Sequence, residues 1–309
     1  MMKVIITGGT GLMGHGLSSL LVSKGYEVIV LSRSPQRAAG LPTGVRVERW
    51  DGRSADGWGQ LVEGATAIVN LAGANLAGTG FFPSRWTAQH KHRIRESRVQ
   101  SGRVVVEAVQ GARDKPRVVI QASAVGYYGF GRDEIFTEDC PAGDDFLARL
   151  TADDWEPSTA AVEDMGVRRV IVRSGVVLST ELGALPRLLL PYRLFVGGPI
   201  GSGKQWLAWI HPYDLSEAIR FLIENEEASG PFNLTAPVPK TNAEFGRTMG
   251  RILGRPSLVP LPGFALRLAL GEVSSVVLEG QRVLPKNLQD MGFEFRFPDA
   301  DSALRDLLE

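Results

Sequence analysis

Three glycines near the start of the chain have the spacing of a phosphate-binding turn, in the segment T-G-G-T-G-L-M-G at 7–14. The first would allow a tight turn, the second would let a diphosphate approach the backbone, and the third would let a helix pack closely on the preceding strand. Unpaired amide hydrogens at the helix N-terminus would then bind the phosphates. The alternative is a glycine-rich turn without a ligand. The predicted dinucleotide contacts are Gly8, Thr10, Gly11, Leu12, Met13 and Gly14.

The residues after the second predicted strand bear on which dinucleotide binds. Sites for NAD usually place an acidic residue there, which holds both ribose hydroxyls. This chain has Ser32 and Arg33 instead, and a guanidinium suits a 2′-phosphate. We therefore predict NADP(H) rather than NAD(H), with a solvated loop arginine as the alternative. Trp50 and Asp51, after the third predicted strand, are expected to flank the adenine.

Two further strand ends are predicted to contribute to the same site, because ligands of open α/β sheets bind at the carboxyl ends of parallel strands. Leu71, Ala72 and Gly73 follow the fourth predicted strand and should lie under the cofactor. Ala122 and Ser123 end the fifth. The hydroxyl of Ser123 would either polarise a substrate oxygen or bond to the backbone at the strand end.

The elements that would position these residues alternate along the first half of the chain. Continuous apolar runs predict buried parallel strands at 4–6, 28–31, 45–50, 67–71, 118–120 and 170–172. Longer stretches between them predict helices, among them 12–24, 83–112 and 152–165. Right-handed crossovers then favour an α/β fold with a doubly wound parallel sheet of the Rossmann type.

The composition of the sequence changes after about residue 178, where prolines and glycines become frequent and predicted strands become scarce. We predict a dinucleotide-binding Rossmann domain made of 1–178, to which 210–235 returns. A smaller, mostly helical substrate or lid domain is predicted from 179–209 and 236–309.

The composition excludes several classes of function. The 309 residues include 34 basic and 34 acidic side chains, and phosphate backbones and anionic membranes are bound mainly by excess positive charge. One cysteine excludes an internal disulfide and fits a reducing compartment. The four histidines and that cysteine lack zinc-ligand spacing, so no metal is predicted. We expect a cytoplasmic protein that binds a small molecule, with no nucleic-acid or membrane partner, and predict no particular oligomeric state.

Several motifs occur in the order of a known superfamily. The glycine turn is followed by N-L-A-G at 70–73, S-A-V-G-Y-Y-G at 123–129 and W-I-H-P-Y-D at 209–214. The chain thereby resembles the extended short-chain dehydrogenase/reductases and, through marks such as D-W-E at 154–156, their atypical "epimerase family proteins". The resemblance covers essentially the whole chain. It implies a Rossmann domain, a nicotinamide dinucleotide (by family habit NADPH) and a small C-terminal lid. Ala74 departs from it, since relatives often carry Glu there.

The proton-transfer pair typical of that superfamily, a Tyr with a Lys four residues later, is absent. The residues four positions after the five tyrosines are Val30, Gly131, Arg132, Val196 and Glu217. Counting back from Arg173, the positions of the pair fall near Thr151 and Trp155, and neither side chain can do this chemistry. Tyr128 is then the nearest phenol and is predicted as a proton donor, with a pocket-wall aromatic as the alternative.

Four more side chains are predicted to line a substrate cleft, namely Tyr127, Gln205, Trp209 and His211. The segment G-x-x-x-x-G-K at 198–204 resembles a P-loop, but Gln205 stands where a Ser or Thr would bind magnesium, so nucleoside triphosphate binding is not expected. His211 has a structural hydrogen bond as its alternative role. For Arg98 a surface salt bridge is favoured over contact with the cofactor.

Two functions follow from these residues. The first is an NADP(H)-binding oxidoreductase or epimerase of atypical mechanism, in which Ser123 and Tyr128 act on the substrate. The second is a non-catalytic NADP(H)-binding protein that acts through a partner, and the absent Tyr–Lys pair is its main support. A conventional sugar-nucleotide isomerase is disfavoured because it needs the same pair.

Overall fold

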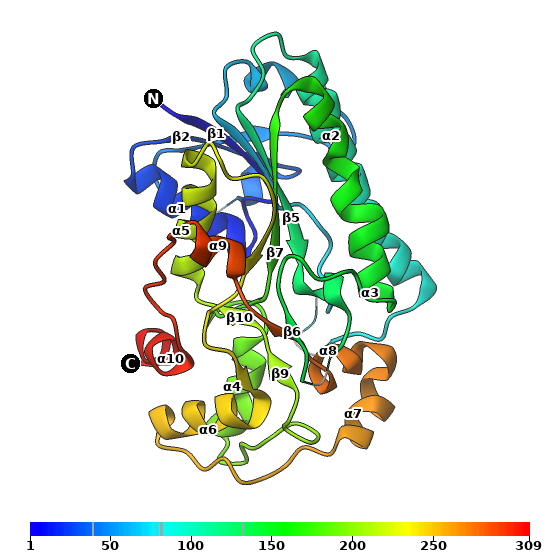
Figure 1. The fold of residues 1–309 in the computed structure, drawn as a ribbon, viewed down its shortest axis with the longest axis vertical. Coiled ribbons are helices and arrows are strands. Elements are labelled where there is room, and N and C mark those ends of the chain that lie inside the picture. Colours follow the sequence, from blue (N-terminus) through cyan, green and yellow to red (C-terminus); the bar gives the residue numbers. More distant parts are fainter. Residues whose placement is uncertain (39, 79, 81–82, 132) are drawn as a thin grey trace.

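The computed structural model of the chain describes residues 1–38, 40–78, 80, 83–131 and 133–309. Within these ranges the central sheet consists of β1 (Lys3–Thr7), β2 (Glu27–Ser32), β3 (Val45–Arg49), β4 (Ala67–Asn70), β5 (Val118–Ala124), β7 (Arg168–Ser174) and β11 (Gly230–Leu234). The strands lie in the order β3-β2-β1-β4-β5-β7-β11, and every neighbouring pair is parallel (Figure 1). The chain order reverses between β1 and β4, and such a reversal opens a crevice at the carboxyl ends of the strands.

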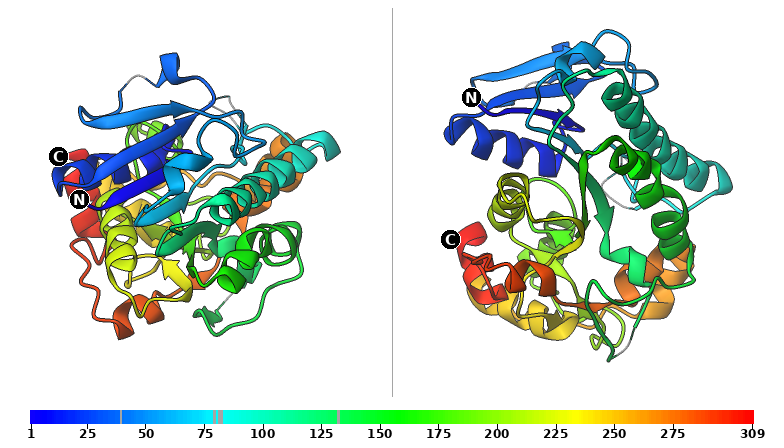
Figure 2. Two further views of the ribbon diagram at one scale, coloured as in Figure 1. Left: turned by 90° about the horizontal axis from the view of Figure 1, so that it is seen from above. Right: turned by 45° about the horizontal axis from the view of Figure 1, so that its top comes forward.

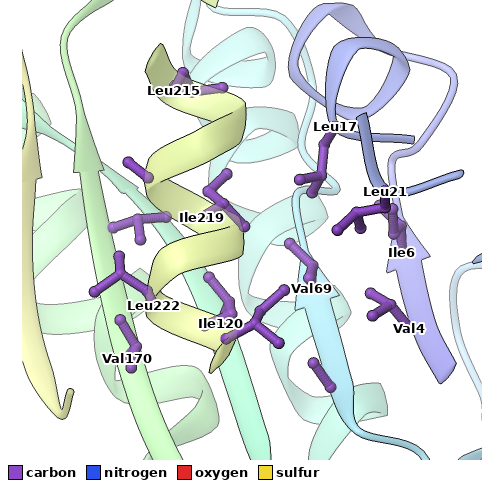
Figure 3. Close-up of a cluster of buried hydrophobic side chains, with 14 of the residues drawn as sticks. Val4, Ile6, Leu17, Leu21, Val69, Ile120, Val170, Leu215, Ile219 and Leu222 are labelled. Carbon is purple, nitrogen blue, oxygen red and sulfur yellow. The ribbon is translucent and has the colours of Figure 1, made fainter. Parts of the chain in front are cut away.

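Helices cover both faces of the sheet. On one face lie α1 (Leu12–Ser23) and α5 (Pro212–Glu224), and on the other lie α2 (Ala88–Gly111) and the 3₁₀ segment η5 (Glu156–Met165) (Figure 2). Successive side chains of a strand point to opposite faces. Val4 and Ile6 therefore join the core under α1 and α5 (Figure 3), whereas Ile5 joins the core under α2. This explains why the strands read as continuous apolar runs.

A third core lies beyond the sheet, in the C-terminal half of the chain. It joins α4 (Leu185–Arg193), α6 (Asn242–Leu253) and α10 (Ala300–Leu308). The described residues also form three pairs of short strands: β6 (Ile135–Phe136) with β13 (Arg282–Val283), β8 (Val176–Val177) with β10 (Trp209–Ile210), and β9 (Trp206–Leu207) with β12 (Lys240–Thr241). The remaining elements are η1 (Pro35–Arg37), η2 (Gly59–Val62), η3 (Val125–Tyr128), α3 (Phe146–Arg149), η4 (Leu150–Trp155), α7 (Gly263–Leu270), η6 (Gly271–Ser274), α8 (Ser275–Leu278) and α9 (Lys286–Asp290).

The predicted fold class, a doubly wound parallel α/β sheet with a smaller and largely helical C-terminal part, is confirmed by this architecture. Residues 210–235 return to the sheet layer, because α5 packs on it and β11 extends it beside β7. Two local predictions differ. The long helix begins only at α2, where the Thr87 side chain accepts from the His90 amide. The helix predicted at 152–165 is instead the π-helical turn η4 followed by the 3₁₀ segment η5.

Two absences can be stated for the described residues. No helix in these ranges is both long enough and apolar enough to cross a bilayer. Among the described residues, no group of three or more His, Cys, Asp or Glu side chains could hold a metal ion.

Candidate functional site

The turn between β1 and α1 has the geometry that its glycines predict. Gly8 has φ +68°, and a Cβ there would lie 2.8 Å from the backbone carbonyl of Leu71. A Cβ on Gly14 would lie 2.4 Å from the Cα of Gly9, so helix and strand approach too closely for any side chain. Gly9 is also required, because its Cβ would meet Val30 at 2.6 Å. The glycine spacing of the motif does not include this position, so the sequence pattern missed it.

Gly11 differs from the other glycines of the turn because the space beside it is open. An added Cβ would have only the carbonyl oxygen of Gly8 within 4 Å, at 3.3 Å. Gly11 is also the N-cap of α1, whose first turn has no side-chain cap and no acidic residue. The amides at this end of the helix therefore have no side-chain acceptor, and they present a partial positive charge. This arrangement fits a diphosphate.

The residues at the ends of β2 and β3 divide into one free charge and three structural groups. Arg33 is exposed and has no ion pair among the described side chains. Ser32 accepts from the amide of Ser34 at 3.2 Å. Asp51 accepts from the amides of Arg53 and Ser54, and these hydrogen bonds lower the pKa of its carboxyl. The ring of Trp50 is buried and forms a T-shaped contact with the ring of Trp58. Little of the Trp50 ring is therefore accessible to an adenine.

A pocket of about 420 Å³ extends from this edge of the sheet to the C-terminal part of the chain. Among the predicted cofactor residues it is lined by Met13, Leu71, Gly73 and Ala122. Ser123 lines it as well, and Gln205 is the one predicted substrate residue on its described wall. The opposite wall includes Trp206, Leu207, Val276 and Gly280. The pocket therefore joins the predicted cofactor edge to the C-terminal region.

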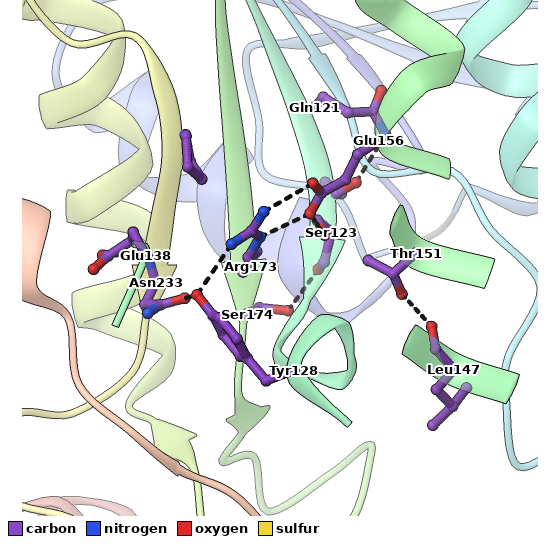
Figure 4. A network of polar contacts seen from close by, with 12 residues as sticks. Gln121, Ser123, Tyr128, Glu138, Leu147, Thr151, Glu156, Arg173, Ser174 and Asn233 are labelled. Atoms are coloured by element: carbon purple, nitrogen blue, oxygen red, sulfur yellow. Dashed lines mark hydrogen bonds and ion pairs between the residues drawn. The ribbon is translucent and has the colours of Figure 1, made fainter. Parts of the chain in front are cut away.

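The Ser123 hydroxyl belongs to a buried network that sequence reasoning did not find (Figure 4). Ser123 Oγ donates to Glu156 Oε1 at 2.6 Å. Arg173 donates to the same carboxylate, from Nε to Oε1 at 2.8 Å and from Nη2 to Oε2 at 3.0 Å. Ser123 and Arg173 lie opposite each other in the pairing of β5 with β7, and Glu156 begins η5. All three side chains are buried.

This network decides what Ser123 can do chemically. Burial works to lower the pKa of Arg173, but the hydrogen bonds and charge of Glu156 outweigh it and hold that pKa above its ordinary value. The carboxylate of Glu156 is thus paired with a permanent cation, and it accepts a hydrogen bond from Ser123 Oγ. The remaining lone pairs of Ser123 Oγ are then free to accept. Ser123 is therefore arranged to receive a hydrogen bond from a hydroxyl.

The geometry does not support Tyr128 as a proton donor. Its hydroxyl donates to Asn233 Oδ1 at 2.7 Å and accepts from Arg173 Nη1 at 3.1 Å. The ring is buried, which raises the pKa of Tyr128 to about 12, and it is not among the residues that line the pocket. Tyr127 also lies outside that lining, with its ring centre 3.4 Å from Arg173 Cζ. Arg132, which has the right spacing from Tyr128, lies outside the described residues.

Thr151 and Trp155, the positions predicted for the absent pair, both line the pocket together with Ser123. They lie in η4, a π-helical turn, and such turns are frequent at functional sites. Thr151 Oγ1 donates to the carbonyl of Leu147 at 2.6 Å. The indole of Trp155 is buried. Neither side chain can exchange a proton at neutral pH. The pocket therefore has no Tyr–Lys pair at these two positions.

Trp209 and His211 lie in the C-terminal core rather than in the pocket, so their predicted substrate roles are not supported. Trp209 packs against Phe245. His211 is the N-cap of α5, where its Nδ1 accepts from the amide of Tyr213 at 3.1 Å. Burial lowers the pKa of His211 to about 4, so the ring is neutral at pH 7. His211 thus makes the structural hydrogen bond that was the alternative to a substrate role.

Arg98 is the clearest departure from expectation. The predicted surface salt bridge is wrong, because Arg98 is only 7% exposed and has no carboxylate partner among the described residues. Its Nη1 donates to the carbonyls of Ala74 and Ile94, and burial lowers its pKa to about 10. Arg98 lines the pocket. Only the packing of α2 against the rest of the chain places it there.

A doubly wound parallel sheet, with a glycine turn after its first strand and a pocket at its carboxyl edge, defines a dinucleotide-binding α/β protein. The sequence profile of the NAD dependent epimerase/dehydratase family matches residues 4–235. The profile of a domain of unknown function, DUF1731, matches residues 261–307. The chain belongs to the NAD-dependent epimerase/dehydratase family.

Individual relatives agree with this assignment along the whole chain. The epimerase family protein YfhF of Bacillus subtilis is 40% identical over 311 residues, which cover 99% of this chain and 98% of that protein. The crystal structure of the human epimerase family protein SDR39U1 (isoform 2) with NADPH is 35% identical, covers 99% of both chains and has a TM-score of 0.89. A nucleoside-diphosphate sugar epimerase from Corynebacterium glutamicum is also 35% identical, with a TM-score of 0.75, and covers 99% of this chain and 58% of that one. The resemblance to epimerase family proteins is thereby confirmed.

Proposed function

We propose that this protein is an NADP(H)-dependent oxidoreductase that interconverts a hydroxyl and a carbonyl group on a small molecule. The observation that carries the proposal is the position of Ser123, a residue of the pocket lining whose hydroxyl donates a hydrogen bond to the buried carboxylate of Glu156. A purely structural serine at a strand end would bond to the backbone. Here the serine connects the pocket to a buried proton acceptor.

The residues present fit the cofactor. The open space beside Gly11 and the uncapped amides of α1 would hold the diphosphate. Arg33, which is exposed and has no ion pair with a described residue, would bind a 2′-phosphate. The human relative, solved with NADPH, supports the same choice of dinucleotide. Leu71, Gly73 and Ala122 would form the floor under the nicotinamide half.

The residues of this chain would handle the proton while the nicotinamide, when bound, supplies or accepts a hydride. In the oxidation direction the substrate hydroxyl donates to Ser123 Oγ. As the substrate carbon gives up its hydride, the hydroxyl proton passes to Ser123, and Ser123 passes its own proton to Glu156. Reduction runs the same transfers in reverse and starts from a protonated Glu156, whose proton comes from water. Arg173 holds the Glu156 carboxylate by two hydrogen bonds and so positions it behind Ser123.

The experiment for this proposal is a turnover assay. Purified protein is mixed with NADPH and a panel of aldehydes, ketones and keto acids, and with NADP⁺ and the matching alcohols. Ser123→Ala should lower turnover about 100-fold, as expected for loss of a proton-transfer group, with NADPH affinity kept. Ser174→Ala is the matched control, because Ser174 also lines the pocket but its hydroxyl donates to a backbone carbonyl, that of Ser123. Equal rates in the wild type and in Ser123→Ala would refute the relay.

A second function, non-catalytic binding of NADP(H), is favoured by one observation. Thr151 and Trp155 line the pocket at the positions predicted for the Tyr–Lys pair, and neither moves a proton. If NADPH binds tightly while no member of the panel turns over, the binding protein becomes the better description. Loss of NADPH binding itself would remove both functions.

The choice of NADP(H) over NAD(H) is tested at Arg33. Arg33→Ala should weaken NADPH binding about tenfold or more by removing a charged hydrogen bond, and should leave NADH binding nearly unchanged. Arg46→Ala is the control, since that exposed arginine pairs with Glu48. Titration calorimetry measures both cofactors. Equal affinity for NADPH and NADH in the wild type would contradict the preference.

A further inference from the structure

Arg98 is a buried cation without a counter-ion in the described part of the chain. It lies on α2, is 7% exposed and lines the pocket. Nη1 is occupied by two backbone carbonyls, but Nε is buried and has no hydrogen-bond partner among the described residues. The guanidinium carbon lies 4.6 Å from the ring centre of Trp155, so one face of the cation is covered by an aromatic ring. Burying an unpaired charge is costly, and proteins ordinarily place an anion against it.

The acidic residues near Arg98 are paired with other arginines. Asp154 pairs with Arg95 on the exposed side of α2, and Glu156 pairs with Arg173 inside the sheet layer. The other charged residue that lines the pocket is Glu279, which pairs with Arg267. The fold therefore supplies carboxylates to the neighbouring arginines and none to Arg98. A ligand in the pocket is the remaining source of an anion.

We propose that the pocket takes a substrate with a carboxylate, and that Arg98 binds this group. The proposal rests on the proposed function, because the same molecule would present its hydroxyl or carbonyl to Ser123. Much of the remaining wall is apolar, with side chains such as Leu76, Leu147, Leu150 and Val176. The substrate class is accordingly a hydroxy or keto acid with an apolar body. The guanidinium supplies charge-assisted hydrogen bonds that distinguish such an acid from its neutral amide.

The cofactor diphosphate is a less suitable partner for Arg98. None of the glycines of the turn after β1 is among the residues that line this pocket, although Met13 of α1 is. The amides of α1 already provide a site for phosphate oxygens. Arg98 lies on α2, beside Trp155 of η4 and also against Gly73, where an added Cβ would be 3.2 Å from Arg98 Cζ.

The test uses benzoate and benzamide, which have the same shape and differ in charge. Protein saturated with NADPH is titrated with each by calorimetry, after NADPH binding has been measured alone. Wild-type protein should bind benzoate about tenfold or more tightly than benzamide. Arg98→Gln should remove this preference, and Arg98→Lys should keep part of it. Arg95→Gln, three residues earlier on the same helix, is the matched control and should keep it fully.

Each outcome decides the proposal. Equal affinity for the two probes in the wild type would refute it, and so would a preference that survives in Arg98→Gln. A variant that binds NADPH about tenfold more weakly, with the benzoate preference intact, would assign the charge to the cofactor and also overturn it. If Arg98→Gln does not fold, the Nε–H resonance of Arg98 in wild-type protein should shift with benzoate and not with benzamide. Failure to bind NADPH would instead count against the proposed function. The carboxylate proposal could still be tested in that case, because the Arg98 resonance can be followed without cofactor.

Discussion

At the scale of single residues, the two buried arginines of the site differ in one respect that separates structure from function. Arg173 has a carboxylate partner within the fold, held by two hydrogen bonds. Arg98 has carbonyl partners and an aromatic face but no anion. The paired arginine positions Glu156 behind Ser123. The unpaired one is the residue from which a charged ligand can be inferred.

His211 is the residue for which a pH dependence can be predicted. Burial lowers its pKa from the ordinary value of 6.5 to about 4, so the unfolded chain takes up a proton at a higher pH than the folded one. Stability from the neutral ring is complete above pH 6.5 and is lost as the pH falls from there towards 4. Between pH 7.5 and 5.5 the free energy of unfolding should fall by about 1 kcal/mol from this group alone.

Urea unfolding at several pH values measures this loss, and His211→Asn is the matched variant. Asn is a good helix N-cap and does not titrate, so the variant should keep α5 while losing this part of the pH dependence. Parallel pH profiles for the variant and the wild type would show that His211 does not titrate as described.

At the scale of elements, the junction of β1 and α1 separates a packing role from a binding role among similar glycines. Gly14→Ala should lower the free energy of unfolding by roughly 1–3 kcal/mol or more, because its Cβ would lie 2.4 Å from the Cα of Gly9. Gly11→Val should keep stability within about 1 kcal/mol, since Gly11 has an extended backbone and open space beside it. The same Gly11→Val change should abolish NADPH binding, because the valine side chain would fill the space where the diphosphate would approach the amides of α1.

Chemical denaturation and calorimetry distinguish these two variants. The opposite pattern, with an unstable Gly11→Val and a stable Gly14→Ala that loses cofactor, would mean that the turn is assigned wrongly.

At the scale of the whole molecule, Asp214 links the C-terminal segment to the sheet layer. It lies in the first turn of α5 and is buried, and its two oxygens accept from the amides of Arg296 and Phe297, each at 2.9 Å. These bonds anchor the chain between α9 and α10 against a helix that packs on the sheet.

Asp214→Asn should therefore destabilise the protein by about 2 kcal/mol, because an amide nitrogen would face one of the two backbone donors. Asp139→Asn is the control, since Asp139 is exposed and lies 3.7 Å from Lys286, and it should change stability by less than about 0.5 kcal/mol. Urea midpoints measure both. Equal midpoints for Asp214→Asn and the wild type would remove Asp214 from this role.

Some of the site could be predicted and some could not. The glycine turn, Ser123 and the lack of a Tyr–Lys pair follow from spacing within short segments. The structure does not support the predicted roles of Tyr128, Trp209 and His211, because a motif does not indicate whether the polar atom of an aromatic or histidine side chain faces a ligand or a neighbouring residue. Asn233 and Phe245 supply those neighbours for Tyr128 and Trp209 from other elements, whereas His211 caps the helix that begins directly after it.

The sequence by itself determined the sheet, its parallel strands and the phosphate turn, because each depends on local periodicity and on backbone conformations that few residues besides glycine adopt. The tertiary structure alone decided the chemistry of the pocket. Ser123, Glu156 and Arg173 come together only when β5 pairs with β7 and η5 packs beside them. Likewise Arg98 becomes a buried, unpaired cation only when α2 packs against its neighbours, since burial and the pairing of charges depend on residues distant in the chain.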